Sequence, residues 1–144
     1  MRAAAIKQLV LDASVVLAWC FEDEKSSYAE GILDLLSQDT GAIVPAVWPL
    51  EITNALLSAL RKKRITQAQA TGFLNRISGF HIEVEESLLS RTFETVFLQA
   101  NASQLTSYDT SYVELALRKG LPLATLDEPL KKAAETLGIT IAKV

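Results

Sequence analysis

Four short apolar runs stand out in the 144-residue sequence, because their hydrophobic residues follow one another without the polar alternation of a half-exposed strand. Stretches with helical spacing separate them. The runs are QLVLD (Gln8–Asp12), AIVP (Ala42–Pro45), LPLAT (Leu121–Thr125) and ITIA (Ile139–Ala142). Runs of this kind are typical of strands that are buried on both faces of a parallel sheet.

Apolar residues at helical spacing fill the segments between these runs. A first helix is predicted directly after Asp12, through Val16 and Trp19. The other predicted helices are Glu24–Gln38, Trp48–Lys63, Thr66–Ser78, Ser87–Ala100, Tyr108–Arg118 and Glu128–Leu137. No repeat, linker or low-complexity tract interrupts this order, so the pattern predicts one α/β domain over residues 1–144, with a parallel sheet covered by helices on both faces.

Acidic residues follow two of the predicted strands. Asp12 ends the first run, and Asp127 comes shortly after LPLAT. Ligands of parallel sheets gather at the carboxyl ends of the strands, so we expect these two acids to share one edge of the sheet.

Helix capping is the competing explanation for three of the acids. Asp12 and Asp127 each precede a predicted helix, and TSYD, from Thr106 to Asp109, resembles a capping box. Glu51 is different, because it shares a narrow polar stripe with Asn54, Ser58 and Arg61 on a helix that is otherwise mostly apolar. We expect that helix to be largely buried, with its stripe facing solvent, a partner or a wet cleft.

The composition of the chain excludes several classes of active site and of protein. The single histidine, His81, excludes a two-histidine ribonuclease, and with the single cysteine, Cys20, it excludes a zinc cluster. There is no P-loop motif. No run is long enough to span a bilayer and the first residues lack the apolar region of a signal peptide, so we expect a cytoplasmic protein. The net charge of −3 argues against a general nucleic-acid binder.

Four carboxylates at one sheet edge would repel one another unless a cation lay among them. Oxygen ligands suit a hard cation, so the sequence predicts a Mg²⁺ or Mn²⁺ site.

Three long segments of the chain resemble PIN-domain ribonucleases, most closely the VapC-type toxins of toxin–antitoxin pairs. The matching segments are LVLDASVVLAWCFEDE, VPAVWPLEITNALL and LTSYDTSYVELALRKGLPLATLDEPLKKAAETLGI. The resemblance implies a three-layer α/β/α domain with a central, mainly parallel sheet, and a Mg²⁺- or Mn²⁺-dependent endoribonuclease. It also implies an RNA substrate, a cognate antitoxin protein and a homodimer.

The same resemblance assigns residues. Asp12, Glu51, Asp109 and Asp127 match the catalytic, metal-binding acids, while Ser14, Asn54 and Thr125 match supporting positions. We expect Asp12 and Asp109 to ligate the metal directly, and Glu51 and Asp127 to complete the site through waters or a second ion. One departure is Glu128-Pro129 after Asp127, where the family often has basic or polar residues.

Two features of the sequence keep alternatives open. The basic cluster Arg61, Lys62, Lys63 and Arg64 either complements a helix C-terminus or contacts RNA or an acidic antitoxin segment.

The acids fit a nuclease, but a PIN scaffold that binds RNA or a partner without cleavage is an alternative. A phospho-acceptor signalling domain fits less well, because Asp12 is followed by Ala13 and no lysine follows LPLAT. Trp19, Phe21 and Trp48 are expected in the core or an interface.

Overall fold

A parallel four-stranded sheet forms the centre of the computed structural model, which describes residues 5–144. The expectation for the first residues of the sequence falls in part on Met1–Ala4, which lie outside the described residues. The strands are β1 (Gln8–Leu11), β2 (Gly41–Val44), β3 (Ile82–Val84) and β4 (Leu123–Ala124), in the order β3-β2-β1-β4. Every residue of β1 after Gln8 is buried, as the unalternated apolar pattern predicts.

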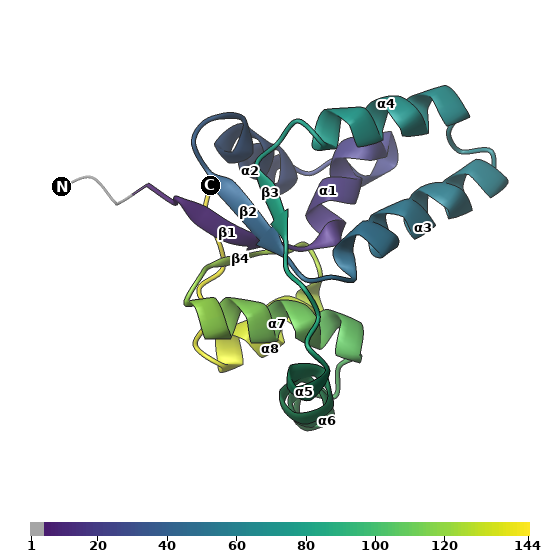
Figure 1. The fold of residues 1–144 in the computed structure, drawn as a ribbon. Coiled ribbons are helices and arrows are strands. Elements are labelled where there is room, and N and C mark those ends of the chain that lie inside the picture. The colour runs from purple at the N-terminus through teal and green to yellow at the C-terminus, as the bar shows by residue number, and fades with distance from the viewer. Residues whose placement is uncertain (1–4) are drawn as a thin grey trace.

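Helices cover both faces of the sheet, which confirms the three-layer α/β/α prediction (Figure 1). One layer contains α1 (Ala13–Cys20), α2 (Ser27–Ser37), α3 (Trp48–Arg61) and α4 (Gln67–Ile77), with the short 3-10 turn η1 (Glu22–Glu24) after α1. The other contains α7 (Ser107–Lys119) and α8 (Glu128–Thr136). Within residues 5–144, no helix combines the length and the apolar character needed to cross a membrane.

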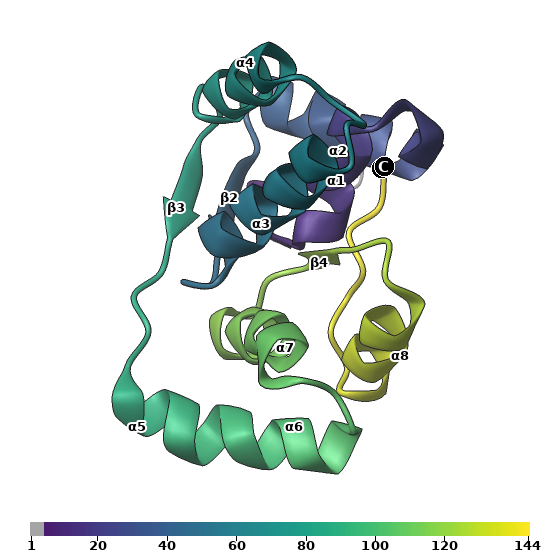
Figure 2. The same ribbon diagram turned by 90° about the vertical axis from the view of Figure 1, so that its right-hand side faces the viewer.

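A long helical arm lies outside α7 and farthest from the sheet (Figure 2). It consists of α5 (Leu89–Arg91), the five-residue π-helical turn η2 (Thr92–Val96) and α6 (Phe97–Ser103). The sequence predicts one helix here, over Ser87–Ala100. Of its four apolar residues Leu88, Phe93, Val96 and Phe97, Val96 alone is buried, and the two phenylalanines are each about two-thirds exposed.

Three further differences have clear physical reasons. β3 was not predicted, because this edge strand has an exposed glutamate and an exposed valine in place of a continuous apolar run. The predicted strand Ile139–Ala142 forms only one parallel bridge, between Leu123 and Ile141. α3 is not largely buried, since Leu50 is 70% exposed and Leu57 is also exposed.

The three aromatic residues expected in the core or an interface are buried or half-buried. Phe21 and Trp48 are buried, and Trp19 is half-buried, with its indole Nε1 donating to the Ala29 carbonyl at 2.7 Å. His81 is exposed just before β3. Cys20 is half-buried rather than buried.

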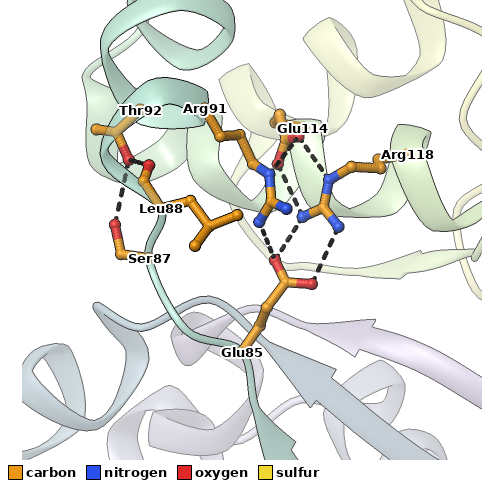
Figure 3. Close-up of polar contacts among 7 residues, drawn as sticks. All are labelled: Glu85, Ser87, Leu88, Arg91, Thr92, Glu114 and Arg118. Carbon is orange, nitrogen blue, oxygen red and sulfur yellow. Dashed lines mark hydrogen bonds and ion pairs between the residues drawn. The ribbon is translucent and has the colours of Figure 1, made fainter.

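A network of four charged side chains holds the exit of β3 against α7 (Figure 3). Glu85 follows β3 and accepts from Arg91 of α5 at 3.1 Å and from Arg118 of α7. Glu114 of α7 is buried and accepts from the Arg118 Nε at 2.7 Å. The hydrogen bonds from Arg118 and the positive charges of Arg118, Arg91 and Lys119 lower the pKa of Glu85.

Replacement of Glu85 by Gln is expected to lower the free energy of unfolding by about 1–3 kcal/mol at pH 7, because charge-assisted hydrogen bonds are lost. Since the pKa of Glu85 is lowered in the folded protein, its contribution is present above the ordinary Glu pKa of about 4.3 and disappears as the pH falls through the folded pKa. Denaturant unfolding at pH 7 and at pH 3 measures this difference. The control is Glu83→Gln, on the exposed face of β3. An equal effect of Glu85→Gln at both pH values would contradict the prediction.

Candidate active site

Asp12 lies at the carboxyl end of β1, where its backbone N–H donates to the Ala124 carbonyl at 3.0 Å and so joins it to β4. The residue is only 6% exposed. Its side chain makes no capping hydrogen bond to α1, so capping does not explain this carboxylate. Instead, its Oδ2 accepts from the Ser14 hydroxyl at 2.6 Å and from the Thr125 hydroxyl at 2.7 Å.

The same two hydroxyls connect Asp12 to the segment after β4. The Thr125 Oγ1 accepts from the backbone N–H of Asp127 at 3.0 Å, and the Ser14 Oγ accepts from the N–H of Leu126 at 3.0 Å. Asp127 is the N-cap of α8, since its Oδ1 accepts from the Leu130 N–H at 2.9 Å. The capping explanation is therefore right for Asp127, which still lies beside Asp12.

Asp109 and Glu51 approach from the first turns of two helices. The Thr106 hydroxyl caps α7 by accepting from the Asp109 N–H at 3.1 Å. The return hydrogen bond of a full capping box is not formed, and the Asp109 carboxylate has no hydrogen-bond donor among residues 5–144. Glu51, on α3, is half-buried, and its Oε1 accepts from the hydroxyl of the fully buried Tyr112 at 2.5 Å.

Charges of neighbouring acids raise the pKa of three of the four carboxylates. Burial raises the pKa of Asp12, the charge of Asp127 raises it further, and the Ser14 and Thr125 hydroxyls oppose both. Burial also raises the pKa of Asp109, as do the charges of Asp127 and Asp12. The pKa of Glu51 is raised by burial and by the charges of Asp12 and Asp109, against the Tyr112 hydrogen bond.

The donor set fits a hard divalent cation. All the available ligands are carboxylate oxygens, and a cation among them would offset the repulsion that raises their pKa values. In the described part of the chain, no three acidic, histidine or cysteine side chains lie together closely enough to hold a metal ion among them. Mg²⁺ binds through one or two carboxylates and keeps several waters, so a looser set of acids is compatible with this ion.

Comparison with known proteins identifies the family of the chain. The family model "PIN domain" matches residues 9–136, which include all four acids. The chain belongs to the PIN domain family.

This PIN domain resembles a protein and a solved structure from Pyrobaculum aerophilum. The chain is 28% identical to "Ribonuclease VapC3" of Pyrobaculum aerophilum over 123 residues, which are 85% of this chain and 92% of that protein. A crystal structure of PAE2754, also from Pyrobaculum aerophilum, superposes with a TM-score of 0.68 at 25% identity and covers 94% of this chain and 95% of its own.

Two further structures share the fold at lower identity. The structure of VapBC2 from Rickettsia felis, bound to a DNA fragment from its promoter, has a TM-score of 0.64 at 12% identity, with 94% and 97% of the two chains covered. FitAcB from Neisseria gonorrhoeae has a TM-score of 0.63 at 14% identity, with 94% and 96% covered.

The other predicted site residues of the PIN domain lie farther out. Asn54 is exposed one helical turn beyond Glu51 and has no hydrogen-bond partner among residues 5–144. The basic cluster begins ten residues after Glu51, about 15 Å along the α3 axis. Within it, Arg64 is already occupied, because its guanidinium pairs with Asp23 at 3.0 Å and lies 4.5 Å from the centre of the Phe21 ring.

Three other cluster members and one neighbouring acid are exposed on the surface. Arg61, Lys62 and Lys63 are exposed. Contact with RNA or an antitoxin stays a prediction for all four residues of the cluster. Glu128, the acidic departure after Asp127, is exposed at the start of α8 and adds negative charge beside the acid site.

Tyr112 is the site residue that the sequence analysis did not select. It lies in the motif YDTSY and follows Asp109 by three residues, so it shares a helix face with that acid. Its role became visible only through the contact with Glu51, 61 positions away. Burial and the hydrogen bond to Glu51 raise the pKa of Tyr112 far above its usual value, so it stays a neutral donor.

Replacement of Tyr112 by Phe is expected to raise the pKa of Glu51, because the ionised carboxylate loses its hydrogen-bond donor. The free energy of unfolding should fall by about 1 kcal/mol. NMR titration of the Glu51 carboxyl carbon measures the pKa, and denaturant unfolding measures the stability. Tyr28→Phe is the matched control, since the Tyr28 hydroxyl donates to the Ala142 carbonyl at 2.6 Å. An unchanged Glu51 pKa in Tyr112→Phe would show that this contact does not set the charge of Glu51.

Proposed function

We propose that this PIN domain is a metal-dependent endoribonuclease that acts as the VapC-type toxin of a toxin–antitoxin pair. The observation that carries the proposal is the convergence of Asp12, Glu51, Asp109 and Asp127, from four separate segments, at the carboxyl edge of one sheet. The relative named Ribonuclease VapC3 supports ribonuclease activity. The VapBC2 structure, whose fold this chain shares, supports a toxin with a protein partner.

The hydrogen bonds suggest how the chain would hold a metal. The two hydroxyls occupy only the Oδ2 of Asp12, so its Oδ1 is left for a ligand. Asp109 is proposed as the second direct ligand, because its carboxylate is not used for capping. Glu51, oriented by Tyr112, and the second oxygen of Asp127 would contact metal-bound waters. When bound, Mg²⁺ or Mn²⁺ supplies an acidified water and positive charge for the non-bridging oxygens of the phosphodiester.

The protein side chains have proposed tasks apart from the metal. Ser14 and Thr125 fix the orientation of the Asp12 carboxylate, which is the supporting role that outer hydrogen bonds play in metal sites. Asn54 stays a proposed supporting residue on the exposed side of Glu51. The alternative function is binding of RNA or a partner without cleavage. It gives no reason for four acids to meet at one edge of the sheet, and we therefore favour catalysis.

Substitution of Asp12 or Asp109 by Asn is expected to lower Mg²⁺-dependent RNA cleavage more than about 100-fold, beyond the 10–100-fold cost of losing an outer partner of a metal ligand. Chelation should abolish cleavage by the wild type, and Mg²⁺ or Mn²⁺ should restore it. Asp34→Asn, on the exposed side of α2, is the control. Gel analysis of a single-stranded RNA and circular dichroism of each variant are the measurements. Cleavage that survives both substitutions in folded protein would disprove the proposed metal ligands, and RNA binding without any wild-type cleavage would favour the alternative function.

We also propose that the chain forms a homodimer through the outer helical arm. Leu89, Phe93 and Phe97 recur every four residues along it, and each is about two-thirds exposed. A contiguous exposed apolar stripe marks an interaction surface in a water-soluble domain. One stripe placed against the same stripe of a second copy would bury both in a two-fold symmetric contact.

Phe93→Glu is expected to convert the dimer into a monomer, because a symmetric contact would bring two new carboxylates together in an apolar interface. Light scattering coupled to size-exclusion chromatography measures the mass. Leu137→Glu, an exposed leucine after α8, should leave the mass unchanged. A wild-type protein that is monomeric at micromolar concentration, or a Phe93→Glu variant that stays dimeric, would rule out this interface.

A further inference from the structure

A cavity of about 210 Å³ lies beside the acid site and has no part in the proposed metal chemistry. We call it the flanking cavity. Residues 45–47, just before α3, and residues 85–88, just after β3, form two of its walls. The arm contributes Arg91 and Thr92, and the start of α7 contributes Ser107, Tyr108 and Ser111, among other residues.

Its walls belong to the segments that carry two of the acids. Glu51 follows residues 45–47 in the first turn of α3, and Asp109 lies between Tyr108 and Ser111. An RNA strand with its scissile phosphate at the acids would therefore bring a neighbouring nucleotide to the flanking cavity.

The charges of the cavity do not favour a phosphate. Arg91 is paired with Glu85 at 3.1 Å and lies 3.8 Å from Glu114, and Arg118 completes this network, so two cations balance two anions (Figure 3). The exposed Glu86 adds a negative charge at the wall. Because Glu85 and Glu114 are already paired, the cavity also offers a basic peptide side chain little free counter-charge.

What the cavity does offer is neutral hydrogen-bonding groups and flat apolar surface. The Ser87 and Thr92 hydroxyls contact each other at 3.1 Å, and the Ser107 hydroxyl has no partner among residues 5–144. Tyr108 is 61% exposed and Leu88 is 48% exposed. Single-stranded RNA is recognised by stacking of its bases on aromatic rings and by hydrogen bonds to their neutral edges.

Size and backbone geometry agree with a small flat ligand. The volume is below the range of about 300–1,000 Å³ that encloses drug-sized ligands, so it suits one ring system. Thr92, which lines the cavity, begins the π-helical turn η2, and such turns occur frequently at functional sites.

We propose that the flanking cavity is a nucleobase subsite, which holds the base of a nucleotide next to the scissile phosphate with Tyr108 as its stacking surface. This inference rests on the proposed ribonuclease function, and it adds a source of sequence preference to it. Tyr108 acts here on substrate position and not on the metal.

The first test does not require cleavage. The four neutral ribonucleosides are titrated into labelled wild-type protein with chelator present, and backbone amide NMR shifts are followed. At least one nucleoside should shift residues 87–92 and 107–111. Tyr108→Ala should abolish these shifts, while Tyr108→Phe, which keeps the ring, should retain them. Ribose 5-phosphate should shift none of them. Absence of shifts with every nucleoside overturns the proposal, as does a response to an antitoxin segment alone, which would make the cavity a peptide-docking site.

The second test maps the cut ends of a random single-stranded RNA pool incubated with Mg²⁺. Tyr108→Ala should lower kcat/KM by about 5- to 150-fold, the range for one lost base–aromatic stack, and should flatten the nucleotide preference beside the cut. Tyr108→Phe, which keeps the ring, should retain the nucleotide preference, and the α7 surface control Leu117→Ala should cleave like the wild type. Full cleavage by Tyr108→Ala with an unchanged preference overturns the subsite but leaves the nuclease. A wild type that cuts no RNA removes the proposed function, and the nucleoside titration then decides about the cavity separately.

Discussion

Two hydroxyl groups donate to a single oxygen of the buried Asp12 carboxylate, and the arrangement of the site depends on that pair of hydrogen bonds. An ionised carboxylate that is removed from water needs hydrogen bonds to remain charged. Ser14 and Thr125 provide them from α1 and from the end of β4, and both also accept from the backbone of residues 126–127. The ends of two strands and the starts of two helices are thereby fixed around one charged oxygen, and the other oxygen stays available.

Parallel topology then determines which other groups reach Asp12. β1 lies between β2 and β4, so the segments that leave these strands start from the same edge of the sheet. Each leads into a helix, and an acid in a first turn or at an N-cap is favourable there because of the helix dipole. Capping and ligand binding are consequently not exclusive: Asp127 does the first and is placed for the second. The fold can gather acids at low local cost and still leave their mutual repulsion unrelieved.

The sequence allowed prediction of what depends on local pattern and not of what depends on tertiary contact. Unbroken apolar runs predicted β1, β2 and β4, and the position of Asp12 and Asp127 after two of them predicted a shared edge. The pattern did not predict β3, because an edge strand needs no continuous apolar run. Apolar spacing also could not say which leucines and phenylalanines find a partner, so the exposure of Leu50 and Phe93 was missed. Tyr112 required knowledge of α3 and α7 together.

Helix α7 carries two acids with opposite surroundings on different faces: one is paired with arginines and the other lies among other acids. Asp109 and Glu114 are five residues apart, about 140° around the helix axis. Glu114 meets Arg118 and Arg91, so on its side charge is matched within the protein and the helix is locked to the exit of β3. Asp109 faces Asp12 and Asp127, where burial and like charge raise its pKa and no side chain in the described part of the chain neutralises it. Because the balanced face fixes the helix, the unbalanced face cannot relax by moving away from the other acids. Protonation or a bound cation would relieve it, so the same helix that stabilises the fold also holds an unneutralised acid at one edge of the sheet.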